Sequence, residues 1–152
     1  MATLWSEYQR YEKKLNTAIN RVLRKEVANV VIKSIEDASQ PNVYDAYDPS
    51  LYSRRYSLKR DSSYKKEVHN NTLTVTAHIM SNPRQPGNGP YVPIEISEII
   101  TNGTPYGPRW SNSRIYNMQP YPRPWMEPGL QDAIDNRSAE MALENGLISL
   151  GF

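Results

Sequence analysis

The sequence predicts an α+β fold: a long N-terminal helix packs on a small antiparallel β-sheet, followed by a short middle helix, a C-terminal helix and long loops rich in proline and tyrosine. Apolar side chains three and four residues apart over residues 4–38 predict an amphipathic helix of about nine turns. Apolar residues that alternate with polar ones from Thr72 to Ile79 predict a strand with one buried face. A length of 152 residues suits one domain with one core.

The first element covers residues 1–40, and its polar face is strongly charged. Its apolar stripe shifts phase between Lys25 and Ala28, so the segment is either one long helix or two helices with a bend there. Pro41 is expected to close it, because a proline disfavours the helical conformation in the preceding residue. Such a helix is long for a small domain. Its far end therefore either covers the core in the ordinary way or projects to a neighbouring subunit.

The middle of the chain is predicted to hold a hairpin between two loops. Residues 41–63 combine tyrosine, proline, aspartate and arginine without periodicity, which is typical of a loop with turns. Residues 64–80 predict two antiparallel strands joined at Asn70-Asn71, a weaker turn signal than Asn-Gly. Residues 81–93 hold three prolines and two glycines before Pro93, and we expect a mobile surface loop.

Residues 94–146 are predicted to form a helix, a loop and a second helix. The first helix is short and apolar, and Asn102-Gly103 is a C-terminal stop signal. The loop from Thr104 to Tyr121 carries a tryptophan, tyrosines and a methionine. That is too much apolar area to leave in water, so we expect the loop to have a partner.

The last helix is expected to begin around Pro124, Trp125 and Met126, with the proline near its first turn and the two apolar side chains in the core. Asn145-Gly146 is a second stop signal, at which this helix should end. The apolar tail, residues 147–152, is then expected to add an edge strand to this subunit or to a neighbour.

Composition fits two descriptions of the chain equally well. The apolar fraction is 38%, and eleven tyrosines stand against one phenylalanine. Tyrosine tolerates both an apolar contact and a wet edge, so this balance favours a subunit that completes its burial against neighbours. The alternative is a small domain with long loops, which twelve prolines would stiffen. A net charge of +2 is too small to indicate nucleic-acid or membrane binding by itself.

The residues that carry chemistry are sparse, and we expect no enzyme, no metal and no cofactor. The chain has no cysteine, and its histidines, His69 and His78, have no carboxylates at ligand spacing. Neither a phosphate-cradling glycine loop nor a nucleophile motif is present. The apolar runs are too short to span a membrane and the N-terminus has no signal pattern, so we expect assembly in a cytoplasm without membrane contact.

Three motifs follow one another along the chain. They are the run Y-D-P-S-L-Y-S-R-R-Y at residues 47–56, the helix end I-I-T-N-G at residues 99–103, and R-P-W at residues 123–125, which opens the last helix. Their order resembles that of the head–tail joining, or tail-completion, proteins of long-tailed bacteriophages. The resemblance implies a small α+β adaptor without an active site, located in the virion at the neck.

The same resemblance implies the partners of the chain. Copies would assemble as a ring of six or twelve around the DNA channel, between the portal-side connector and the tail tube or tail terminator, with non-specific DNA contact inside the channel. Contact between copies falls to the first helix and loop 41–56, and docking between rings to loops 81–93 and 104–122 and the tail. The candidate interface residues are Tyr44, Tyr47, Tyr52, Arg54, Arg55, Tyr106, Trp110, Tyr116, Arg123 and Trp125.

A small nucleic-acid-binding module is the alternative from another class. Segment 52–66 places Arg54, Arg55, Lys59 and Arg60 among tyrosines, and aromatics among cations can stack bases and meet phosphates. Solvated or salt-bridged charge explains the same pattern. A steep loss of DNA affinity with added salt would favour the binding module.

Overall fold

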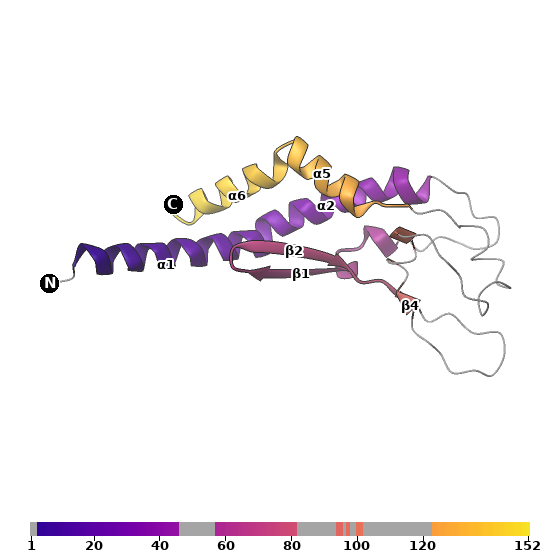
Figure 1. Ribbon diagram of the computed structural model, residues 1–152. Coiled ribbons are helices and arrows are strands. Elements are labelled where there is room, and N and C mark those ends of the chain that lie inside the picture. The colour runs from indigo at the N-terminus through magenta and orange to yellow at the C-terminus, as the bar shows by residue number, and fades with distance from the viewer. Residues whose placement is uncertain (1–2, 46–56, 82–93, 96, 98–99, 102–122) are drawn as a thin grey trace.

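A computed structural model describes residues 3–45, 57–81, 94–95, 97, 100–101 and 123–152. It confirms the α+β fold: a long N-terminal helix, a two-stranded antiparallel sheet and C-terminal helices (Figure 1). The first helix continues from Leu4 to Tyr44 through four segments. These are α1 (Leu4–Val22), the π-helical η1 (Leu23–Val27), α2 (Ala28–Ser39) and the π-helical η2 (Gln40–Tyr44).

The π-helical segment η1 lies where the apolar stripe of the sequence shifts phase. A π turn holds more residues than an α turn, so the helix absorbs the shift without breaking. Of the two alternatives, the structure therefore has one continuous helix.

The expectation that Pro41 closes the helix is wrong, because helical structure continues through η2 to Tyr44. The wider π turn lets the Asp45 N–H donate to the Gln40 carbonyl, five residues back, at 2.8 Å. Pro41 has no N–H to donate to the Asp37 carbonyl, four residues back, and the Gln40 N–H donates to that carbonyl instead.

The hairpin is confirmed, with β1 (Tyr64–His69) antiparallel to β2 (Thr72–Ala77). Its turn residues Asn70 and Asn71 both have positive φ, 48° and 59°, as a tight hairpin turn requires. The turn also rests on α1. The Asn71 side-chain amide donates to Asn16 Oδ1 at 2.9 Å, and the Asn71 backbone N–H donates to Asn20 Oδ1 at 3.1 Å.

A second short sheet differs from the prediction for residues 94 onward. Strand β3 (Met80–Ser81) pairs with β4 (Ile94–Glu95), where the sequence predicted the start of a helix. Pairing with β3 satisfies backbone groups of Ile94 and Glu95 that a first helical turn would leave open. Ser97, Ile100 and Thr101 are helical, and the remainder of that predicted helix and the loops 82–93 and 102–122 lie outside the described residues.

The C-terminal part forms two helices, where the sequence predicted one. Helix α5 (Met126–Asp135) and helix α6 (Ser138–Ser149) meet at Arg137, whose backbone is left-handed with φ 58°. Pro124 lies just before α5, so it precedes the first turn. Asn136 supports the break, because its side-chain oxygen accepts the Ser138 N–H at 2.9 Å.

Gly146 does not end α6, and the tail does not form an edge strand. The residue lies inside the helix at its contact with α1, where an added Cβ would stand 2.4 Å from Val22 Cγ1. The helix ends at Ser149, and Gly151 follows it with φ 86°. There Gly151 donates to Ile148 and Phe152 to Leu147, at 3.0 and 3.1 Å, the paired bonds of a Schellman motif.

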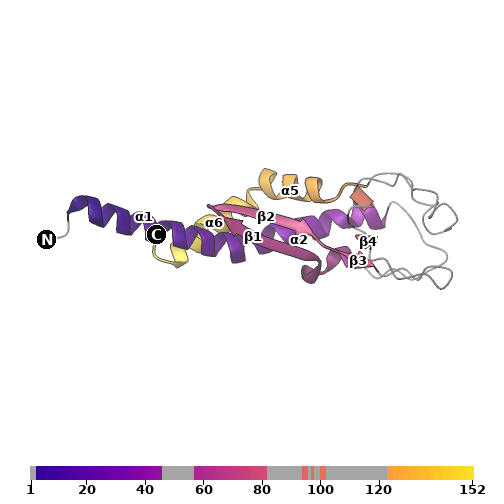
Figure 2. The same cartoon turned by 60° about the horizontal axis from the view of Figure 1, so that its bottom comes forward.

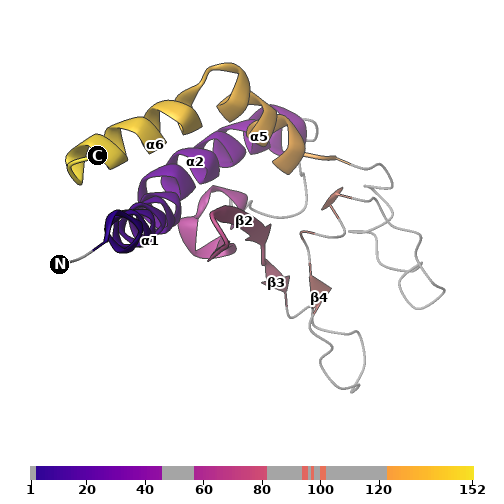
Figure 3. The same cartoon turned by 60° about the vertical axis from the view of Figure 1, so that its left-hand side comes forward.

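The core lies where α2 runs between α5 and the hairpin (Figure 3). Gly129 lets α5 approach α2 closely, since a Cβ there would stand 2.5 Å from the Ile35 Cα atom. Trp125 is fully buried and its indole donates to Tyr64 Oη at 3.4 Å, which in turn donates to the Leu58 carbonyl at 2.6 Å. Burial raises the pKa of Tyr64 to about 12.

Candidate subunit interface

Two of the candidate interface residues belong to the core. Tyr44 is 8% exposed, and its hydroxyl accepts the Leu58 N–H at 2.9 Å. Trp125 has no exposed surface. Their assignment to an interface is therefore corrected for the folded subunit, because an aromatic with a polar group is equally suited to a core that supplies a hydrogen-bond partner.

Of the other candidate interface residues, the structure describes one, Arg123. Arg123 is half-buried, and its backbone N–H donates to the Ile100 carbonyl at 2.8 Å. It ties the start of the C-terminal part to the middle of the chain. Seven candidates lie outside the described residues and stay predictions: Tyr47, Tyr52, Arg54, Arg55, Tyr106, Trp110 and Tyr116.

The basic segment of the alternative prediction is described from residue 57 onward. Lys59 is exposed, while Lys66 makes an ion pair of 2.9 Å with Asp61 and donates to Asn29 Oδ1 at 3.2 Å. Lys66 therefore helps to hold the hairpin on the long helix. Of the residues named for the nucleic-acid alternative, Lys59 and Arg60 are exposed, and Arg54 and Arg55 lie outside the described residues.

The first exposed apolar surface is the free end of α1. The helix extends beyond α6 and the hairpin (Figures 1 and 2), and its residues 3–14 are all exposed. Leu4, Trp5, Tyr8 and Tyr11, here called the N-terminal stripe, are 87%, 66%, 56% and 57% exposed. Trp5 and Tyr8 stack with ring centroids 5.8 Å apart. A group of large apolar side chains that is left more than half exposed on a helix end is typical of an interaction site.

Local interactions set the conformation of this free end. Thr3 stands at the N-cap without a side-chain cap, and its carbonyl accepts the Ser6 hydroxyl at 2.8 Å. Glu7 in the first turn is favourable near the positive end of the helix dipole. An isolated helix as short as the exposed part of α1, residues 4–14, is marginal in water without packing. A partner along the apolar side of this part would therefore stabilise it.

The stripe continues onto the segment that follows α6. The Phe152 and Tyr11 rings lie 6.0 Å apart, and Ile148, in the last turn of α6, is 67% exposed. The sequence predicted an edge strand for this tail and missed its contact with α1. No helical spacing indicates that contact, because Phe152 lies beyond the end of α6, after the left-handed Gly151.

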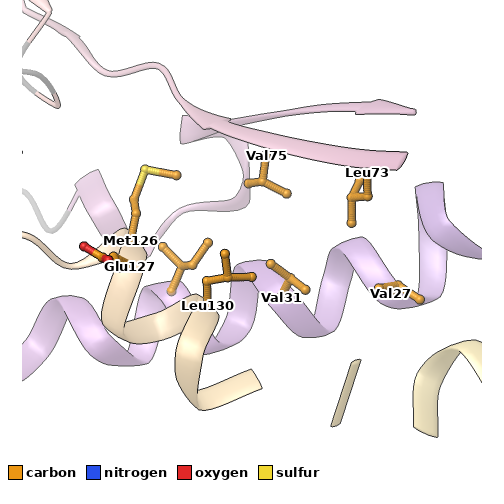
Figure 4. A pocket seen from close by; sticks show the side chains of 8 residues that line it. Val27, Val31, Leu73, Val75, Met126, Glu127 and Leu130 are labelled. Atoms are coloured by element: carbon orange, nitrogen blue, oxygen red, sulfur yellow. The ribbon is translucent and has the colours of Figure 1, made fainter. Parts of the chain in front are cut away.

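The second exposed apolar surface is a groove between α5 and β2, with α2 as its floor (Figure 4). It has a volume of about 360 Å³. Leu130 of α5 is 46% exposed at its mouth, and Leu73 and Val75 of β2 are half-buried on the opposite side. The α5–β2 groove is lined by Val27, Val31, Ile35, Leu73, Val75, Met126, Glu127 and Leu130.

The two surfaces have opposite charge around them. Helix α1 carries the basic residues Arg10, Lys13, Lys14 and Arg21 against Glu7 and Glu12. Helix α5 carries only acidic charge, in Glu127, Asp132 and Asp135, all of them exposed. The neighbouring Arg137 does not offset this, because its guanidinium is bonded to Glu140 at 2.7 and 2.9 Å and lowers the pKa of that carboxyl.

The described residues include no group of three or more histidine, aspartate or glutamate side chains that could hold a metal ion. None of the helices in the described ranges is both long and apolar enough to cross a membrane.

A family model described as YomN matches residues 7–149. Because the match covers nearly the whole chain, the chain belongs to the YomN family, and this phage-related family makes it a phage-associated protein. The matched range includes the α5–β2 groove and, of the N-terminal stripe, Tyr8 and Tyr11. No curated protein and no solved structure matches the chain.

Proposed function

We propose that this member of the YomN family is a structural protein of the tailed-phage neck. It would act as a ring-forming adaptor or tail-completion protein that joins the head connector to the tail around the DNA channel. The N-terminal stripe is the observation that carries the proposal. A helix end that exposes Leu4, Trp5 and Tyr8 has a clear use in a subunit with neighbours. The phage-related family and the order of the three neck-like motifs support the same assignment.

The size of the stripe indicates what kind of assembly it can support. Aromatic side chains bury roughly 150–250 Å² each, so Leu4 and three rings at more than half exposure leave on the order of 400 Å² uncovered. Covering that area contributes about 10 kcal/mol before the cost of association, which is about 4–15 kcal/mol. One such contact is close to break-even. Closure of a ring or docking on a neighbouring ring would add the contacts that decide assembly.

In the proposed neck, the adaptor does no chemistry. Copies would contact one another through the long helix, in a ring of six or twelve. The ring faces would meet the portal-side connector and the tail tube or tail terminator, and residues on the channel side would touch passing DNA without sequence preference.

The test is complementation of a phage that lacks this gene product. Wild-type protein should restore infectious particles, and without it free heads and free tails should accumulate. The double variant Trp5→Ser, Tyr8→Ser should reduce joined particles by about tenfold or more, because one lost apolar contact of a few kcal/mol is enough for that change. Gln9→Ala, an exposed polar position on the same helix, is the matched control and should complement fully.

Electron microscopy counts joined and unjoined particles, and mass spectrometry of purified virions detects the chain. Purified particles that lack the chain would contradict the proposal, as would normal joining of heads to tails in its absence.

A further inference from the structure

We propose that the N-terminal stripe of one copy packs into the α5–β2 groove of a second copy, so that copies join head to tail. This inference rests on the proposed self-assembly and names the two surfaces that carry it. Both surfaces are apolar, and each lies on a different part of the subunit.

The continuous helix prevents the stripe from reaching the groove of its own chain. Val27 and Val31 in the floor of the groove lie on the same helix as the stripe. Sixteen residues separate Tyr11 from Val27. At 1.5 Å per residue this is about 24 Å along one helix, so the stripe lies too far from the groove to fill it. The occupant of the groove must therefore come from another chain.

The dimensions of the two surfaces agree. The exposed end of α1, residues 4–14, has a length of about 16 Å, and the ten residues of α5 span about 15 Å. The six-residue strand β2, on the other side of the groove, spans about 20 Å. A helix end with one apolar side can therefore lie along the groove, with its rings against Leu130, Leu73 and Val75.

Charge selects a second copy as the occupant. The projecting end of α1 has a positive net charge, from Arg10, Lys13 and Lys14 against two glutamates. Helix α5 carries only acidic charge, and its Glu127 lines the groove. The opposite net charges of the two helices favour this partner over an apolar helix of acidic character.

The pairing has a consequence for symmetry. Each copy offers one stripe and one groove, so the contact is heterologous. An open row of copies has an uncovered stripe at one end and an empty groove at the other. Such contacts form rings when the rotation per copy closes.

The test uses two variants that each lose one surface. The stripe variant carries Trp5→Ser and Tyr8→Ser, and the groove variant carries Leu130→Asp. All three side chains are at least 46% exposed, so both variants should fold, which circular dichroism and thermal melting verify. Light scattering of wild-type protein should show assemblies at concentrations up to about 1 mM, the weak end of protein association. Each variant alone should stay monomeric.

An equimolar mixture of the two variants gives the decisive result. The stripe variant keeps its groove and the groove variant keeps its stripe, so one contact should form and none beyond it. The expected mass is twice the 17.5 kDa of one chain, without larger species. A stripe-to-stripe dimer would instead leave the groove variant assembled, and docking of another protein in the groove would leave the mixture monomeric. Either result would overturn the pairing.

A charge exchange tests the same contact without touching its apolar part. Glu127→Lys with Asp132→Lys should weaken assembly about tenfold or more, and adding Lys13→Glu with Lys14→Glu should restore it. Lack of restoration would count against the pairing. Wild-type protein that stays monomeric at about 1 mM would also overturn it. Phage complementation is scored in particles, so the pairing can fail while the neck assignment stands, and the neck assignment can fail while the pairing stands.

Discussion

The two ends of the long helix differ in what surrounds them, although both have an amphipathic pattern. Around α2, the apolar positions are Val31, Ile32 and Ile35, all at most 6% exposed between α5 and the hairpin. At the free end of α1, the corresponding positions hold tyrosine and tryptophan and are more than half exposed. Aliphatic side chains therefore pack α2 within the subunit, and amphipathic aromatics lie exposed at the free end of α1, where a neighbour can reach them. Tyr44, at the other end of the helix, is buried because the Leu58 N–H gives its hydroxyl a hydrogen-bond partner.

The largest expected effect separates the two ends with one residue type. Trp125→Ala should lower the free energy of unfolding by about 3–5 kcal/mol, because it empties a fully buried site and removes the indole bond to Tyr64. Trp5→Ala, its matched control, should change the free energy by about 0.5 kcal/mol or less. Urea denaturation of dilute protein measures both. Equal effects of the two substitutions would show that Trp5 is also packed within the subunit.

The next effect concerns the two glycines at helix contacts. Gly146→Ala should cost about 1–3 kcal/mol, since the new methyl group overlaps a Val22 side chain that can shift. Val22→Ala should recover part of that loss in a double-mutant cycle. Gly129→Ala should cost at least as much, because its neighbours are backbone atoms of Ile35 and Ser34, and trimming Ile35 should not rescue it. Rescue at both sites, or at neither, would contradict this distinction.

A pH dependence follows from the buried phenol of the core. The pKa of Tyr64 is about 12 in the folded chain, against an ordinary 10.0, because burial disfavours the phenolate. A raised folded pKa means that its contribution to stability is complete below pH 10 and is lost as the pH rises through 12. Tyr64→Phe should show a flatter decline than wild type over this range. Thermal melting at several pH values measures the difference, in which the other titrating groups cancel.

The smallest effect is expected at the hairpin tip. Asn16→Ala removes the exposed bond from the Asn71 amide and should cost about 0.5–1 kcal/mol. Hydrogen exchange at the hairpin amides should increase more than exchange in α2. An effect as large as that of Trp125→Ala would show that the hairpin tip, and not the core, holds the hairpin on the long helix.

Much of the fold was predictable because it depends on local patterns. The long helix, its irregularity near Lys25–Ala28 and the hairpin at Asn70-Asn71 all follow from periodicity and turn chemistry. Gly146 was misread as a stop signal because its meaning comes from Val22, more than a hundred residues away in the chain. Tyr44 was misread as an interface residue for a similar reason, since its burial depends on the segment around Leu58.

The candidate site was predictable only in part. The amphipathic pattern of the first helix allowed a projecting end, and the sequence left open whether the end projects. The α5–β2 groove brings together side chains from three distant segments, so no local pattern indicates it. Periodicity could not decide between a covered and a projecting helix end, because it measures which side of a helix is apolar and not what covers that side.

The π-helical segment η1 holds one residue more than an α-helix of the same rotation would need. An α-helix turns about 100° per residue, so deleting one residue from a purely α-helical part of α1 would rotate the free end by about that angle relative to α2. Deleting one residue from Leu23–Val27 would instead restore α geometry and leave the two ends facing nearly as they do now. The segment therefore buffers a change of one residue in length, so that related chains can lose that residue and keep the N-terminal stripe aimed in the same direction.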